Sequence, residues 1–142
     1  MLLHKRTISN LDKDRLIEAL DLARGRWTTY APFLDHFRAE VRRTAPVEPP
    51  DVPGDVITMN SRFALLDLLT DERISYTLVY PEDESRRDGK ISILSPMGTV
   101  LLGARVGDEV CWDSADGPQV ARITGLLFQP EAAARARHEV FN

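Results

Sequence analysis

The stretch SPMGTVLLGARVGDEV, residues 95–110, decides the fold because it joins a helix start, a short apolar helix and a turn. Ser95 can cap the helix by accepting a hydrogen bond from a backbone N–H of the first turn. Pro96 suits the first helical position, and Gly103 can adopt the left-handed conformation that ends the helix. Gly107-Asp108 then predicts a turn. A helix of two turns is unstable alone in water, so it must pack on a sheet.

The segments on either side of this helix have the alternating apolar pattern of β-strands. The most regular segment is 74–80, which is rich in β-branched and aromatic residues. We predict strands at 56–60, 62–67, 74–80, 91–94, 110–112 and 120–128, and a weak helix within the tail from 130 to 142. Strands joined by brief turns, with one short helix among them, indicate an α+β domain with an antiparallel sheet.

The first 45 residues have the pattern of a short antiparallel helical hairpin, or coiled coil. Ser9-Asn10 can cap a first helix that ends near Gly25, and Thr28 or Thr29 can cap a second helix with Pro32 in its first turn. The apolar stripes are Leu16, Ile17, Leu20 and Ala23 on the first helix, and Phe33, Leu34, Phe37 and Val41 on the second. Two helices of about 14 residues give a hairpin that projects about 20 Å.

Four prolines between residues 44 and 55 prevent the second helix from continuing and predict an extended linker. The predicted organisation is a helical hairpin at 1–45, a linker at 46–54 and a sheet domain at 55–142. The apolar stripes of the hairpin can satisfy one another within one chain, which favours a monomer.

Composition excludes several classes of function. Residues 1–45 carry a net charge of +3 and residues 46–142 a net charge of −7 within a total of −4, so the larger part repels nucleic acid and no direct nucleic-acid binding is expected. No apolar run is long enough to cross a bilayer, and the first residues do not resemble a secretion signal, so we expect a cytoplasmic protein without a membrane partner. Cys111 is the single cysteine, and its strand position predicts a packed, unreactive thiol.

No pattern in the chain predicts a metal, a cofactor or a catalytic residue. The three histidines are far apart and have no metal-ligand spacing, and the glycines match neither a dinucleotide nor a phosphate-binding loop. The acidic loop from Glu82 to Asp88 also contains Arg86 and Arg87, which indicates a solvated turn. A Ser/His/Asp arrangement stays open, although no nucleophile-elbow motif is present.

Four segments resemble a known family. DVITMNSR (55–62), YTLVYP (76–81), ISILSPMGTVLLGARVGDEV (91–110) and FQPEAAA (128–134) are similar to the C-terminal domain of the bacterial Gre transcript-cleavage factors, and most of all to the Rnk family of regulators of nucleoside diphosphate kinase. The resemblance implies an FKBP-like domain that docks on RNA polymerase at the entrance of the secondary channel. It also implies that Ser95, Pro96 and Met97, with Leu94, form the docking turn, although Leu94 stands where the Gre pattern has an acid.

The same resemblance limits the chemistry at the hairpin tip. Gre factors hold a catalytic Mg²⁺ with carboxylates at the tip of a long coiled coil, whereas this tip contains Arg24, Arg26 and Trp27 and no carboxylate. Asp21 and Asp35 lie a turn or more away. We therefore expect a non-catalytic polymerase-binding regulator that can compete with Gre factors, and possible partner contacts at the three tip residues. The alternatives are a transcript-cleavage factor, a peptidyl-prolyl isomerase, and a protein that acts directly on nucleoside diphosphate kinase.

Overall fold

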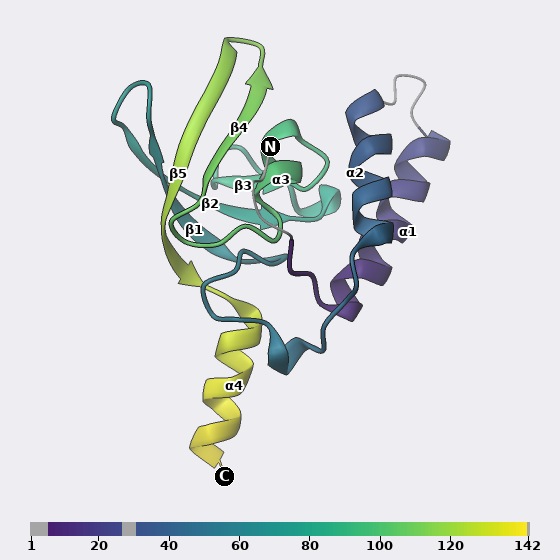
Figure 1. The fold of residues 1–142 in the computed structure, drawn as a ribbon, viewed down its shortest axis with the longest axis vertical. Helices are drawn as coiled ribbons and strands as arrows, with labels where there is room; N and C mark the ends of the chain where they lie inside the picture. The colour runs from purple at the N-terminus through teal and green to yellow at the C-terminus, as the bar shows by residue number, and fades with distance from the viewer. Residues whose placement is uncertain (1–5, 27–30, 142) are drawn as a thin grey trace.

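A computed structural model describes residues 6–26 and 31–141 of the chain (Figure 1). Two helices come first, followed by a five-stranded sheet that contains a short helix, and a last helix ends the chain. The helices are α1 (Asn10–Arg26), α2 (Pro32–Arg43), α3 (Pro96–Leu101) and α4 (Pro130–Phe141), with short 3₁₀ turns at Pro49–Asp51 and Pro81–Asp83. The strands are β1 (Arg62–Asp67), β2 (Arg73–Val79), β3 (Lys90–Ser92), β4 (Glu109–Ser114) and β5 (Gly117–Phe128). The predicted α+β class, with an N-terminal helical hairpin and a C-terminal sheet, is confirmed.

The strands are ordered β3-β2-β1-β5-β4, so β3 and β4 are the two edges of the sheet. The pairs β1–β2, β1–β5 and β4–β5 are antiparallel, as predicted. The pair β2–β3 is parallel, and for this pair the prediction of an antiparallel sheet is wrong. The charged loop at residues 80–89 is long enough to carry the chain back, so that β3 enters beside β2 in the same direction.

Helix α3 forms as its sequence predicts. The Ser95 hydroxyl oxygen accepts a hydrogen bond from the Gly98 N–H at 3.0 Å, and Pro96 is the first helical residue. Gly103, just beyond the helix, has a φ of 79°, which is the left-handed conformation that ends a helix. Gly107, with a φ of 98°, makes the turn into β4.

The segment before β1 differs from its prediction as a strand. Residues 56–60 form no strand, because Ile57 pairs instead with the chain that leaves α3: its N–H donates to the Ala104 carbonyl and its carbonyl accepts from the Gly103 N–H, both at 2.8 Å. Residues 56–59 are all buried, so this part of the segment has no solvent face. Alternation therefore could not identify its conformation.

The hairpin packs along the sheet domain (Figure 1). Buried side chains of α1 and α2, including Leu16, Leu20, Phe37 and Val41, belong to the same apolar cluster as Phe63 and Leu102 of the sheet domain, as does Leu94. The expected projecting coiled coil is thus folded back against the domain for most of its length. The division into a helical hairpin at 1–45, a linker at 46–54 and a sheet domain at 55–142 stays a prediction.

The ends of the two hairpin helices differ in part from the prediction. The Ser9 hydroxyl oxygen accepts from the Asp12 N–H at 3.1 Å and caps α1, as expected. Helix α1 ends at Arg26, one residue beyond Gly25, as predicted. Helix α2 has Pro32 in its first turn, but its N-cap is Ala31, which makes no side-chain hydrogen bond; Thr28 and Thr29 lie outside the described residues. None of the helices in the described segments is long and apolar enough to span a membrane.

Candidate protein-docking site

The turn that enters α3 presents Pro96 to solvent. Pro96 is exposed, while Ser95 and Met97 are half-buried. The Ser95 hydroxyl both accepts from the Gly98 N–H and donates to the Ser92 carbonyl at 2.7 Å, so its hydrogen-bonding groups hold the turn. Ser95 therefore shapes this surface, and the apolar side chains of Pro96 and Met97 are the groups that a partner can contact.

A hollow of about 500 Å³ lies beside this turn, between the two edge strands of the sheet. Its apolar lining includes Tyr76, Ile91, Met97 and Trp112, and its polar lining includes Lys90 and Asp113. A second hollow of about 260 Å³ shares Tyr76, Met97 and Trp112 and continues toward β1. Met97 thus joins the exposed turn to an apolar groove across the sheet, which is a suitable shape for a protein partner.

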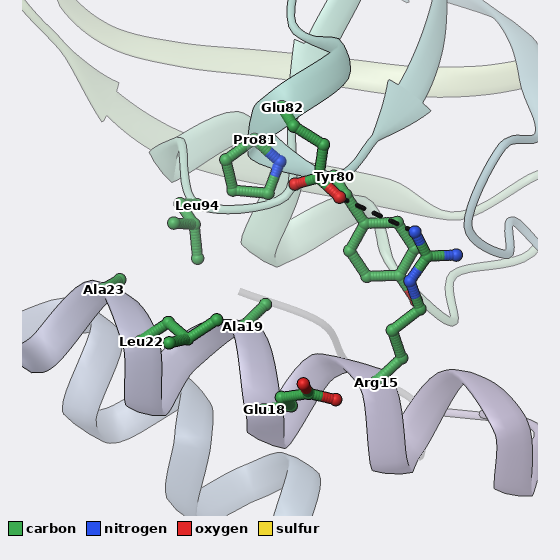
Figure 2. A pocket seen from close by; sticks show the side chains of 9 residues that line it. All are labelled: Arg15, Glu18, Ala19, Leu22, Ala23, Tyr80, Pro81, Glu82 and Leu94. Carbon is green, nitrogen blue, oxygen red and sulfur yellow. Dashed lines mark ion pairs between the residues drawn. The ribbon is translucent and has the colours of Figure 1, made fainter.

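Leu94 faces the other side of the docking turn. It is 7% exposed and lines a hollow of about 230 Å³ between α1 and the end of β2 (Figure 2). Ala19, Leu22 and Ala23 of α1 face it across this hollow. The structure separates the four predicted docking residues into two places, with Leu94 against the hairpin and the other three beside the groove.

An arginine and an aromatic ring close the far end of the hollow beside Leu94. The guanidinium of Arg15 lies 4.1 Å from the centre of the Tyr80 ring, and it pairs with Glu82 at 3.6 Å (Figure 2). Both Arg15 and Glu82 are exposed, so this ion pair contributes less than about 1 kcal/mol. The stacking of the Arg15 guanidinium on the Tyr80 ring still holds α1 beside the end of β2.

Three of the four sequence motifs that carry the family resemblance meet at one junction. Thr58 from the first motif, Tyr80 from the second and Glu131 from the last surround Asp12 of α1. The Thr58 hydroxyl donates to Glu131 at 2.6 Å, and the Met59 N–H donates to Asp12 at 3.3 Å. Burial and the nearby charge of Glu131 raise the pKa of Asp12 to about 6, against the opposing effects of the Met59 N–H and Arg15. Burial also raises the pKa of Tyr80.

Gln129, in the motif FQPEAAA at residues 128–134, has a structural role. It is 3% exposed, and its side-chain amide donates to the carbonyl oxygens of Pro53 and Val56 at 2.8 and 2.7 Å. Its carbonyl oxygen accepts from the Ala132 N–H at 3.1 Å and so caps α4. The quoted Gln-Pro-Glu stretch therefore has a structural role, because it ties α4 to the linker.

Sequence reasoning missed Arg6, which is the most connected charged residue in the described part of the chain. Its side chain is 9% exposed and pairs with Glu40 of α2 at 2.9 Å. It also donates to the carbonyl oxygens of Thr99 and Leu102 at 2.5 and 2.7 Å, at the C-terminal end of α3. Burial lowers the pKa of Arg6, and Glu40 opposes this effect. Nothing in the local sequence distinguishes Arg6, because its partners, from Phe37 to Leu102, all lie far from it along the chain.

The predicted tip residues are only partly placed. Arg24 is exposed near the end of α1, whereas the side chain of Arg26 and all of Trp27 lie outside the described residues. Asp21 pairs with Arg38 of α2 at 2.7 Å, and Asp35 is exposed in the first turn of α2. Within residues 6–26 and 31–141, no group of three or more His, Cys, Asp or Glu side chains is arranged to hold a metal ion.

Two other residues differ from expectation. Cys111 is exposed on β4, so the prediction of a packed thiol is wrong; the inward positions of this strand are Val110 and the half-buried Trp112. Of the five aromatic residues that could line an isomerase pocket, only Tyr76 and Trp112 line the groove. Phe63 and Tyr80 are buried in the core, and Phe128 lies exposed at the end of β5.

Comparison with known proteins agrees with the fold and the motifs. Residues 52–126 match the family described as transcription elongation factor GreA/GreB, C-terminal domain. The chain belongs to this GreA/GreB family, and the resemblance inferred from its sequence is confirmed. It is 36% identical over 129 residues to a protein of Escherichia coli K12 named regulator of nucleoside diphosphate kinase. The alignment covers 89% of this chain and 91% of the Escherichia coli protein.

A solved structure and an elongation factor extend the comparison. The chain is similar to the structure of a prokaryotic transcription elongation factor GreA/GreB from Nitrosomonas europaea, with a TM-score of 0.75, 36% identity, and coverage of 87% of this chain and 100% of the other. It is also 35% identical over 89 residues to transcription elongation factor GreA of Sulfurovum, which covers 63% of this chain and 55% of that protein. The similarity to the Rnk-type regulator thus includes the hairpin as well as the sheet domain.

Proposed function

We propose that this protein is a non-catalytic regulator of transcription that binds RNA polymerase through the docking turn at Ser95, Pro96 and Met97. The observation that carries the proposal is an exposed proline on a capped, rigid turn beside an apolar groove. A preformed contact surface loses little conformational freedom on binding, which favours affinity. Membership of the GreA/GreB family supports the polymerase as the partner.

The proposed docking place is the entrance of the secondary channel, as in the Gre factors. The hairpin supports occupancy of this entrance without transcript cleavage, because α1 packs on the sheet domain through Leu16, Leu20 and Ala23. Asp21, one of the two carboxylates nearest the tip, already pairs with Arg38. A carboxylate that neutralises an arginine is a poor ligand for Mg²⁺, and a hairpin folded against its own domain has little reach.

In this proposal the protein competes with Gre factors for one place on the polymerase. An effect on nucleoside diphosphate kinase would then follow from altered transcription. Leu94 contributes indirectly, because it belongs to the apolar cluster that holds the hairpin beside the docking turn. The arginines of the hairpin tip remain candidate second contacts.

Competition for core RNA polymerase tests the proposal. The full-length protein should displace a labelled GreA-type factor, and Pro96→Ala should weaken that displacement by about tenfold, or about 1.4 kcal/mol. Pro50→Ala is the matched control, because Pro50 is an exposed proline in the 3₁₀ turn at Pro49–Asp51, which packs near α4 and lines neither hollow, and it should compete like the unchanged protein.

Two results would contradict the proposal. One is the absence of polymerase binding at micromolar concentration by protein whose circular dichroism shows that it is folded. The other is cleavage of RNA in an arrested elongation complex by the purified protein, which would favour the cleavage-factor alternative. A proline-isomerisation assay on a short peptide separately tests the isomerase alternative, for which the groove offers only two aromatic side chains.

A further inference from the structure

Where the hairpin, the sheet domain and the last helix meet, one loop binds two carboxylates that come from distant parts of the chain. Asp12 is in the first turn of α1, and Glu131 is in the first turn of α4. Consecutive residues of one loop hold them: the Thr58 hydroxyl donates to Glu131, and the Met59 N–H donates to Asp12. Because adjacent Cα atoms are about 3.8 Å apart, these two contacts place the carboxylates near each other.

The surroundings of this pair disfavour two negative charges. Asp12 is half-buried, and Tyr80 is 2% exposed with a hydroxyl that has no hydrogen-bond partner among the described residues. Among the other charged groups, Arg15 adds positive charge near both Asp12 and Tyr80, and Glu82 adds negative charge near Tyr80. Arg15 compensates only weakly, because its side chain is exposed and paired with Glu82.

A half-buried acid pair such as Asp12 and Glu131 is most stable when it holds one proton, because that proton removes the repulsion and the desolvation of one charge. Burial, followed by the charge of Glu131, raises the pKa of Asp12 from 3.8 to about 6. In the closed state, α1 lies against the sheet domain, and in an open state it does not. An acid whose pKa is higher in the closed state binds its proton more tightly there. The closed state is therefore favoured at low pH, and this advantage is lost as the pH rises from about 4 through about 6.

We propose that Asp12 and Glu131 form a proton-dependent latch that holds α1 against the sheet domain at mildly acidic pH and loosens it as the pH rises. The latch acts on one defined contact, since Asp12 is carried by the hairpin while Glu131, Thr58 and Tyr80 belong to the body of the protein. Loosening would change the population of an open hairpin beside Leu94 and the docking turn. The inference does not depend on polymerase binding.

Amide hydrogen exchange on the full-length protein tests the latch. The amides of α1 should be less protected than those of β1 and β5, because the hairpin opens without global unfolding. Their protection should fall by about tenfold between pH 5 and pH 7.5, as expected for a carboxyl whose pKa is 3.8 when open and about 6 when closed. Asp12→Asn, which keeps an oxygen acceptor for the Met59 N–H, should remove this dependence and protect α1 more strongly at pH 7.5.

Matched variants separate the latch from a general effect of charge. Asp14→Asn removes an exposed carboxylate from the same helical turn and should keep the pH dependence of the unchanged protein. Glu131→Gln keeps an acceptor for Thr58 but removes the second charge, so the pH response should become smaller and move to lower pH.

The titration of the Asp12 carboxyl carbon in the unchanged protein, followed by NMR, gives a result even if a variant does not fold. A midpoint near 6 supports the latch, and a midpoint near 3.8 would overturn it. Equal protection of α1 and the sheet at every pH would also overturn it, because the hairpin would then open only when the whole protein unfolds. So would an identical pH response in Asp12→Asn and the unchanged protein.

Discussion

Helix α3 is only six residues long, yet the surroundings of its two ends are opposite. At the C-terminal end, Leu102 and Gly103 are buried, and Arg6 binds the carbonyl oxygens of Thr99 and Leu102. At the N-terminal end, Pro96 is exposed beside the apolar groove. The difference shows how a helix too short to be stable alone can present a rigid surface: one end is anchored by residues from the hairpin, so the other end can stay open to a partner.

Removal of the anchor should have the largest effect on stability. Arg6→Ala deprives Glu40 of its partner and leaves two carbonyl oxygens of α3 without their donor. We expect it to lower the free energy of unfolding by about 3 kcal/mol. Urea denaturation measures this loss, and Arg122→Ala, which removes an exposed ion pair with Glu109, should lower it by less than about 1 kcal/mol. Equal losses in the two variants would show that the anchor is no stronger than a surface pair.

The middle of α3 should be almost as sensitive. A Cβ atom at Gly98 would overlap the backbone carbonyl of Ser92, which cannot move aside without distorting β3. Gly98→Ala should therefore destabilise the protein by about 2 kcal/mol. Gly25→Ala is the control, because no atom lies within 4 Å of an added Cβ there, and it should stabilise α1 by about 0.5 kcal/mol. Thermal unfolding should show melting temperatures that shift in opposite directions.

The N-terminal cap should have a smaller effect than the anchor. Ser95→Ala removes the acceptor of the Gly98 N–H and the donor to the Ser92 carbonyl. We expect a loss of about 1 kcal/mol in urea denaturation, with most of it restored in Ser95→Thr, which keeps a hydroxyl. If Ser95→Thr were as unstable as Ser95→Ala, the hydroxyl would not be the stabilising group.

A substitution at the exposed N-terminal end of α3 should have little effect on the free energy of unfolding. Pro96→Ala should change the free energy of unfolding by less than about 0.5 kcal/mol, because Pro96 is exposed and its ring fills no core site. The same variant is expected to weaken competition for polymerase, so chemical denaturation and competition should be measured on one preparation. A large loss of stability in Pro96→Ala would remove the contrast between the two ends of α3.

Local signals in the sequence predicted much of the fold. The cap at Ser95, the proline that begins α3 and the turn conformation of Gly103 each depend on neighbours a few residues away, and all three are confirmed. Local alternation failed at residues 56–60, where both faces are buried. It was also misapplied at Cys111: a residue between two inward-facing positions of a strand points outward.

The candidate docking site was found in the sequence, but its geometry was not. Resemblance selected residues 94–97 as one set, whereas the structure places Leu94 against α1 and Met97 in the groove. The motifs around Thr58, Tyr80 and Glu131 marked the family, but nothing local indicated that they would enclose Asp12. Such placements depend on how the hairpin packs on the sheet.

By itself, the sequence determined where the helices and most strands lie, the α+β class and the family, because caps, turns and apolar periodicity act within a few residues. Only the tertiary structure decided that the hairpin lies against the sheet, that Arg6 anchors α3 and that the charge of Glu131 acts on Asp12. The reason is physical. The energy of a charged group depends on its burial and on its neighbours, and here those neighbours come from the other end of the chain.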